Sequence, residues 1–243
     1  MRYFIHLAYN GTRFCGWQIQ PHSPSVQETI EKNLSKILGE SISIVGAGRT
    51  DSGVHASCYY AHFETTKEFD LQDITYKLNR ILPYDIVIYN IYEVTDDLHA
   101  RFSALSRTYT YTITNIKNPF ANETEYYYHT QLDVEAMNAA CTYLIGEKDF
   151  TSFSKLHTDV NNNICTVTEA RWEQNGTKLI FTISANRFLR NMVRSIVGTM
   201  LDIGKGKIST NDFVKIIESK NRQNAGQSIP ACGLSLCNII YRD

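Results

Sequence analysis

The chain has 243 residues, is 43% hydrophobic and 20% charged, and carries a formal net charge of −1. This composition excludes a disordered or fibrous protein and predicts one large or two small domains with a substantial core. Because the net charge is close to zero, a polyanion such as nucleic acid would have to be bound by a local basic patch.

The cysteines and histidines give no sign of a metal centre or a disulfide framework. The six cysteines are scattered without a Cys-x-x-Cys pair, and no cysteine or histidine spacing is typical of a zinc site. We therefore expect reduced cysteines, no metal and, because no apolar stretch reaches the roughly 18 residues of a membrane span, a cytoplasmic protein.

Residues 1–105 show the order strand, helix, strand, strand, helix, strand. The first helix is predicted over 25–38, where apolar residues recur at helical spacing and Ser25 and Glu28 form a capping box. The second is predicted to begin after Asp70 as N-cap and to end before Pro83. Strands are expected at 2–9, 41–45, 57–64 and 85–94. This order is that of a ferredoxin-like unit.

Residues 106–243 repeat that order. Strands are expected at 107–115, 165–173, 177–184 and 234–241, the middle two joined by the hairpin turn Asn175-Gly176. Helices are expected at 133–145, where Gly146 ends the helix, and at 190–203 and 209–218. The sequence thus predicts an α/β (α+β) protein with two ferredoxin-like halves, mainly antiparallel sheets and a boundary near Leu105.

A local basic cluster lies between residues 187 and 207. It comprises Arg187, Arg190, Arg194, Lys205 and Lys207 and is opposed only by Asp202. The spacing of the three arginines predicts that they share one face of the helix expected over 190–203. Such a face is either the solvated side of an amphipathic helix or part of a polyanion-binding surface, and the pattern alone does not decide between them.

The segment 46–55, Gly-Ala-Gly-Arg-Thr-Asp-Ser-Gly-Val-His, is the most unusual in the chain. Its three glycines allow sharp turns and close backbone approach, so Asp51 is presented on a loop between two strands. Asp51 is therefore either a functional carboxylate or a residue that only caps a turn.

Residues 48–56, Gly-Arg-Thr-Asp-Ser-Gly-Val-His-Ala, resemble the active-site signature of the tRNA pseudouridine synthase I (TruA) family, with Ser52 in place of the common alanine. Further similar blocks follow in order along nearly the whole chain. They are Tyr9-Asn10-Gly11-Thr12 with Gly16-Trp17-Gln18, Ser25-Val26-Gln27-Glu28, Ala100-Arg101-Phe102-Ser103-Ala104 with Arg107-x-Tyr109-x-Tyr111, Gly146-x-x-Asp149-Phe150-Thr151-Ser152-Phe153, and Asn186-x-Phe188 with Met192-Val193-Arg194-x-Ile196-Val197-Gly198.

The resemblance implies the pseudouridine synthase fold and isomerisation of uridine to pseudouridine in the anticodon stem-loop of tRNA, at positions 38, 39 and 40. Uracil is detached from ribose at N1, turned, and rejoined through C5, which requires no cofactor. The resemblance also implies a homodimer, in which two subunits combine their basic surfaces around one tRNA.

The resemblance further assigns roles to individual residues. Asp51 would be the essential carboxylate, acting by attack on the ribose C1′, by attack on uracil C6 or by abstraction of a ribose proton. Arg194 would be the cation paired with it. Tyr109 would stack on the target base and remove the C5 proton, although its spacing also fits an ordinary strand residue. Arg49 would fill the space that the flipped nucleotide leaves or hold its phosphate, and Leu234 would add an apolar wall to the uracil pocket.

Two other functions are compatible with parts of the sequence. Ferredoxin-like units with exposed aromatic residues also serve as non-catalytic RNA-binding modules, but such modules do not need a presented carboxylate. A glycosidase-like enzyme for small nucleosides would need a second carboxylate as general acid, and no other carboxylate lies in a comparable motif.

Overall fold

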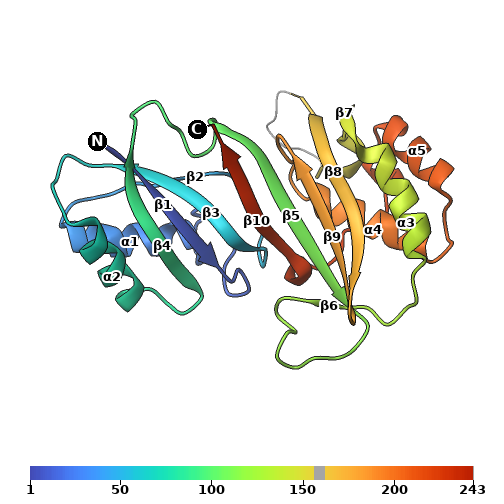
Figure 1. Ribbon diagram of the computed structural model, residues 1–243, viewed down its shortest axis with the longest axis horizontal. Helices are drawn as coiled ribbons and strands as arrows, with labels where there is room; N and C mark the ends of the chain where they lie inside the picture. Colours follow the sequence, from blue (N-terminus) through green and yellow to red (C-terminus); the bar gives the residue numbers. More distant parts are fainter. Residues whose placement is uncertain (156–161, 243) are drawn as a thin grey trace. The chain divides into compact units, whose positions relative to one another are not determined.

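The computed structural model describes residues 1–155 and 162–242, which form two compact units (Figure 1). The first unit contains Met1–Leu105 and Ser235–Asp243, and the second contains Ser106–Leu234. The chain thus changes units after Leu105, but the closing strand, which the sequence analysis placed in the second half, groups with the first unit. Within this unit, Ser235 and Leu236 of the closing strand lie opposite His55 and Ala56 in a parallel pairing.

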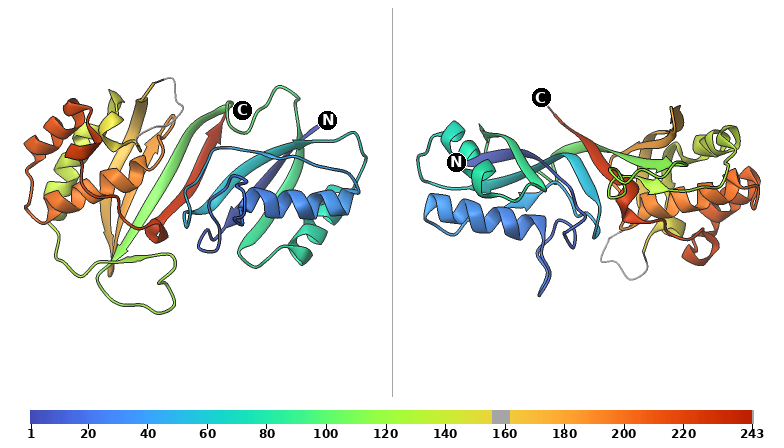
Figure 2. Two further views of the ribbon diagram at one scale, coloured as in Figure 1. Left: turned by 180° about the vertical axis from the view of Figure 1, so that it is seen from behind. Right: turned by 90° about the horizontal axis from the view of Figure 1, so that it is seen from below.

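The first unit has the ferredoxin-like order of elements. Its sheet runs β4-β1-β3, with antiparallel pairs, and β2 pairs antiparallel with β3. Helix α1 crosses one face of this sheet, as Figure 2 shows from behind. The elements are β1 (Arg2–Tyr9), α1 (Val26–Leu38), β2 (Val45–Gly46), β3 (His55–Glu64), α2 (Leu71–Ile81), β4 (Ile86–Val94) and β10 (Leu234–Tyr241).

Strand β2 is much shorter than the strand predicted over 41–45. Side chains of α1 take the backbone groups that a longer strand would have paired: the amide of Ile42 donates to Ser35 Oγ at 2.9 Å, and that of Ile44 to Glu31 Oε1 at 2.8 Å. Since these amides are already satisfied, only Val45 and Gly46 pair with β3.

The second unit has a sheet of order β5-β9-β8-β7 in which these neighbours are antiparallel, while β6 pairs in parallel with β5. Its elements are β5 (Ala104–Thr114), β6 (Tyr126–Tyr127), α3 (Val134–Cys141), β7 (Gly146–Asp149), β8 (Ile164–Asn175), β9 (Lys178–Ala185), α4 (Met192–Gly204) and α5 (Thr210–Ser219). Single 3₁₀ turns occupy Thr142–Leu144, Thr151–Phe153, Arg222–Asn224 and Ala231–Gly233. The predicted α/β class with mainly antiparallel sheets is confirmed.

Helix α3 ends at Cys141, earlier than the sequence predicted. Gly146 adopts φ = 98° and begins strand β7, in which Gly146 lies opposite Val167 of β8. The end of the expected helix is a 3₁₀ turn, Thr142–Leu144, and the residues that follow it form an edge strand that the sequence did not predict. Among the described residues, no helix is long and apolar enough to cross a membrane.

Candidate active site

Asp51 lies in the loop that connects β2 to β3, where it is half-buried, while Arg49 is exposed. The amide of Val54 donates to the carbonyl of Asp51 at 3.1 Å, and Gly53 between them has φ = 77°. Asp51 therefore opens a tight turn, and the glycine supplies the left-handed conformation that the turn requires.

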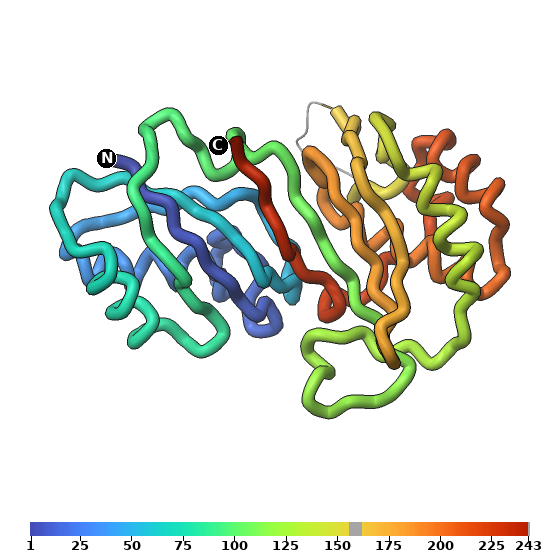
Figure 3. The backbone as a smooth tube through the Cα atoms, in the orientation of Figure 1, coloured from blue at the N-terminus to red at the C-terminus, as the bar shows by residue number. Residues whose placement is uncertain are grey.

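A second loop, residues 10–17, follows β1 and packs against this turn; its blue tube can be followed in Figure 3. A side chain on Gly16, which has φ = 86°, would overlap the carbonyl of Thr50, and one on Gly11 would overlap the carbonyl of Val54. The two loops are thus in direct backbone contact on both sides of Asp51. This contact explains the two glycines in the motifs Tyr-Asn-Gly-Thr and Gly-Trp-Gln.

Hydrogen bonds fix the same contact. The amide of Gly53 donates to the carbonyl of Phe14 at 3.2 Å, and that of Gly11 to His55 Nδ1 at 3.0 Å. The hydroxyls of Tyr9 and Thr50 lie 2.9 Å apart. A loop held at both ends in this way presents its carboxylate with little conformational freedom.

Aromatic side chains support the start of the loop. The Trp17 and Tyr59 rings lie 4.2 Å apart, and a side chain on Gly46 would overlap both. The Tyr59 hydroxyl donates to the carbonyl of Gly48. In contrast, a side chain on Gly48 would meet no described atom within 4 Å, so space is open next to Arg49.

Tyr109 belongs to the second unit and lies on β5 opposite Ile183 of β9. Its half-buried ring meets the edge of Phe188 at a centroid distance of 5.0 Å and an interplanar angle of 83°. Tyr109 is therefore a strand residue, and its ring is held by an aromatic contact. Phe188 belongs to the motif Asn186-x-Phe188, and no local pattern in the sequence indicates its contact with Tyr109.

Arg194 lies in the first turn of α4, and its Nε donates to the carbonyl of Ile229 at 2.7 Å. The prediction that Arg187 and Arg190 share its helix face is wrong. The helix begins only at Met192, because Asn191 adopts φ = 67°, so both arginines precede it. Arg187 instead contacts Asn162 Oδ1 at 3.4 Å.

The other basic residues of the cluster pair as the sequence suggested. Lys205 and Lys207 lie 2.8 and 3.7 Å from the same carboxylate oxygen of Asp202. The negative charge of Asp202 offsets part of the positive charge of these two lysines. Arg194 differs from them, because its guanidinium is hydrogen-bonded to a backbone carbonyl.

Two groups lie in the electrostatic field of Arg194: the buried Tyr111 hydroxyl and the half-buried Cys232 thiol. Burial raises the pKa of the Tyr111 hydroxyl and that of the Cys232 thiol, and the positive charge of Arg194 opposes both shifts. Tyr111 and Cys232 are therefore neutral at physiological pH. Leu234, two residues after Cys232, is 5% exposed, and its contact with a base stays a prediction.

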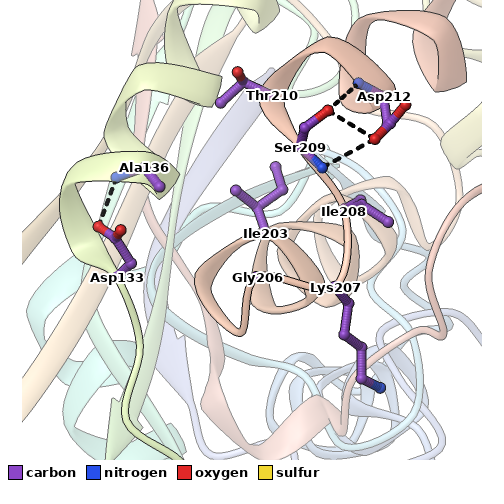
Figure 4. Close-up of a pocket in the computed structure, with 9 residues that line it drawn as sticks. All are labelled: Asp133, Ala136, Ile203, Gly206, Lys207, Ile208, Ser209, Thr210 and Asp212. Carbon is purple, nitrogen blue, oxygen red and sulfur yellow. Dashed lines mark hydrogen bonds between the residues drawn. The ribbon is translucent and has the colours of Figure 1, made fainter.

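A separate pocket of about 400 Å³ lies where α3, α4 and α5 meet in the second unit (Figure 4). Its carboxylates already serve as helix caps: Asp133 accepts from the amide of Ala136, and Asp212 forms a capping box with Ser209. None of the predicted site residues Arg49, Asp51, Tyr109, Arg194 and Leu234 lines this pocket, so it is separate from the residues that the sequence singles out.

The α/β organisation with mainly antiparallel strands is that of an enzyme of the pseudouridine synthase fold. A family model described as tRNA pseudouridine synthase matches residues 6–103 and 140–242. The chain belongs to this family and is an isomerase, which rules against the alternatives of a non-catalytic RNA-binding module and a glycosidase-like enzyme.

Full-length relatives support this assignment. The tRNA pseudouridine synthase A of Bacteroides fragilis is 52% identical over 99% of this chain and 96% of its own length. The protein of the same name from Bacteroides thetaiotaomicron is 50% identical over 99% and 90% of the two chains. That of Clostridium acetobutylicum is 42% identical over 98% of each.

Proposed function

We propose that this enzyme converts uridine to pseudouridine in the anticodon stem-loop of tRNA, at positions 38, 39 and 40. The observation that carries the proposal is the Asp51 loop, which contacts Gly11 and Gly16 on its two sides and whose sequence resembles the family signature. The reaction breaks the bond between ribose C1′ and uracil N1 and forms one between C1′ and C5, while the C5 proton is lost and N1 gains one. The atoms balance without a cofactor.

Asp51 is the catalytic carboxylate in this proposal. Its loop is held by backbone contacts on both sides, so little reorganisation is needed when the substrate arrives. Attack on C1′, attack on uracil C6 and abstraction of a ribose proton all require the ionised form. A carboxylate shielded from water needs an opposing cation, and Arg194 fills that role.

Tyr109 acts on the base. Its ring is held by Phe188 and by the strand pairing of β5, which suits a side chain that stacks on uracil. Its hydroxyl takes the C5 proton after the base is rejoined. Leu234 adds an apolar wall to the same pocket.

Arg49 acts on the flipped nucleotide. A uridine inside a stem is stacked, so it must be extruded before it can reach Asp51, at a cost of a few kcal/mol. Arg49 is exposed, lies two residues before Asp51, and borders the open space at Gly48. The exposed guanidinium occupies the vacated stack or binds the phosphate of the extruded nucleotide.

The enzyme works in the cytoplasm as a homodimer in this proposal. One chain has a net charge of only −1, so two copies would combine their local basic surfaces around one tRNA. Light scattering at micromolar concentration should report about twice the 27.8 kDa of one chain. A fully active monomer would contradict the dimer.

The central experiment uses an unmodified tRNA transcript. Pseudouridine is mapped by carbodiimide-dependent primer extension after incubation with the wild-type enzyme and, as a matched control, with the Asp51→Asn variant. We expect new stops in the anticodon arm with the wild type alone. No stop there would reject the proposed substrate site, and stops elsewhere in the tRNA would reassign it.

A further inference from the structure

A short segment of the second unit, residues 225–230, lies along helix α4, and we call it the strap. The carbonyl of Gln227 packs directly on Gly198, where any side chain would overlap it. The amide of Gly226 donates to Thr199 Oγ1 at 2.9 Å. Because residues 194 and 198 are four positions apart, the strap lies on the helix face that carries Arg194.

The strap contacts Arg194 itself through Ile229. The carbonyl of Ile229 accepts from Arg194 Nε at 2.7 Å, and its amide donates to the carbonyl of Arg194 at 3.3 Å. A guanidinium is planar, with five N–H donors in fixed directions. Engagement of Nε therefore sets the plane of the group and the directions in which its two terminal nitrogens point.

Tyr111 holds the next residue of the strap. Its hydroxyl donates to the carbonyl of Pro230 at 2.8 Å, and its side chain is 0% exposed. Burial raises the pKa of this hydroxyl, so it stays a neutral donor at physiological pH. Gly233 permits the arrangement, because a side chain there would come within 2.7 Å of the Tyr111 ring.

Polar contacts also hold the strap at Ser228. Asn191 Nδ2 and one terminal nitrogen of Arg222 donate to Ser228 Oγ at 2.5 and 2.9 Å. The other terminal nitrogen of Arg222 donates to the carbonyls of Ala225 and Gly226, at 3.3 and 3.1 Å. The strap is thus held by side chains on both flanks of Ile229.

We propose that Tyr111 is a positioning residue for the isomerisation, which acts through the strap to orient the guanidinium of Arg194. The inference rests on the proposed role of Arg194 as the cation of the site. Tyr111 contacts no reacting atom in this scheme. It fixes the Pro230 carbonyl, and through the adjoining peptide it fixes the Ile229 carbonyl that Arg194 Nε binds.

The first test is the Tyr111→Phe variant, which keeps the ring and removes the hydroxyl. We expect the single-turnover rate at saturating enzyme to fall about tenfold, while the Kd for tRNA changes less than about twofold. The matched control is Tyr126→Phe, which removes a tyrosine hydroxyl from the same neighbourhood. The Tyr126 and Tyr111 ring centroids lie 6.4 Å apart, but Tyr126 belongs to strand β6 and not to β5. The control should turn over at the wild-type rate. A wild-type rate in Tyr111→Phe would overturn the proposal.

The second test is a double-mutant cycle with Arg194→Lys, since lysine has no Nε–H to bind the Ile229 carbonyl. If Tyr111 acts through Arg194, adding Tyr111→Phe to Arg194→Lys should lower the rate by less than about twofold. An additive loss would show a merely structural role for Tyr111 and would leave the role of Arg194 intact. Wild-type turnover by Arg194→Lys alone would show that the reaction does not need an oriented guanidinium, which would overturn the inference but not the proposed role of a cation at this position.

A milder variant covers the case in which Tyr111→Phe folds poorly. Ser228→Ala removes the contacts to Asn191 and Arg222 on the other flank of the strap. We expect about a threefold lower single-turnover rate with unchanged tRNA binding, and no further loss in the Arg194→Lys background. An unchanged rate, or an additive loss, would overturn the proposal.

Discussion

Asp51 in the first unit and Arg194 in the second are held by different kinds of contact. The Asp51 loop is fixed by backbone packed on backbone, which is possible only because Gly11 and Gly16 carry no side chains. Arg194 is fixed by hydrogen bonds to a strap that side chains hold in place. Close packing tolerates almost no substitution, whereas a hydrogen-bonded support can be weakened one donor at a time.

The largest effect is expected for Asp51→Asn, which keeps the shape of the side chain and removes its charge. Pseudouridine formation should become undetectable, because each of the three proposed routes uses the carboxylate. Binding of tRNA, measured by filter retention, should change little, since phosphate contacts dominate affinity. Turnover within tenfold of wild type would show that the clamped loop does not carry the reaction.

The next largest effect is expected for Tyr109→Phe. The ring contact with Phe188 is kept and only the hydroxyl is lost, so binding should survive while the single-turnover rate falls about 100-fold. Single-turnover rates at saturating enzyme separate a slower reaction from weaker tRNA binding. Wild-type turnover would reduce Tyr109 to a strand residue with a packing role.

Gly16→Ala tests the packing of the first unit directly. The new methyl group would overlap the Thr50 carbonyl, and residue 16 has φ = 86°. The free energy of unfolding should therefore fall by about 2 kcal/mol. Thermal melts followed by circular dichroism measure this loss. Gly48→Ala is the matched control, because its methyl group meets no described atom within 4 Å, and its melting temperature should equal that of the wild type. Equal melting temperatures for both variants would show that the backbone contact between Gly16 and Thr50 does not stabilise the first unit.

The smallest effect is expected for Arg49→Ala. If Arg49 stabilises the extruded nucleotide, single-turnover rates should fall about tenfold even at saturating enzyme. The fluorescence of a 2-aminopurine beside the target uridine should report slower extrusion. Unchanged extrusion together with an unchanged rate, accompanied by a salt slope lower by about one unit, would identify Arg49 as an ordinary phosphate contact.

Local signals in the sequence predicted most of the elements. Strands β1 and β10 have the expected bounds, and α1 and α2 begin at the expected caps, Ser25 and Asp70. The errors lie where distant side chains or unusual backbone conformations decide the outcome. Strand β2 is shortened by Ser35 and Glu31, and the start of α4 is delayed by Asn191.

The candidate site was predicted only in part, for the same reason. The three glycines around Asp51 indicated a presented carboxylate, and the family resemblance singled out Tyr109 and Arg194. No local pattern indicated that Gly16 packs on Thr50, or that Ile229 binds Arg194 from 35 residues further along the chain. Such contacts depend on the tertiary fold, which spacing within one segment does not encode.

The place of β10 has a consequence for the order in which a ribosome completes the two units. The first unit begins the chain but needs residues 235–241 beside β3, where Tyr241 also bonds the carbonyl of Ala100 at 2.7 Å. The second unit is encoded between these two parts, so its described residues have all been synthesised before the last strand of its neighbour emerges. The unit that carries Asp51 is thus started first and finished last, and until then its strand β3 keeps an open edge near His55, at the end of the Asp51 loop.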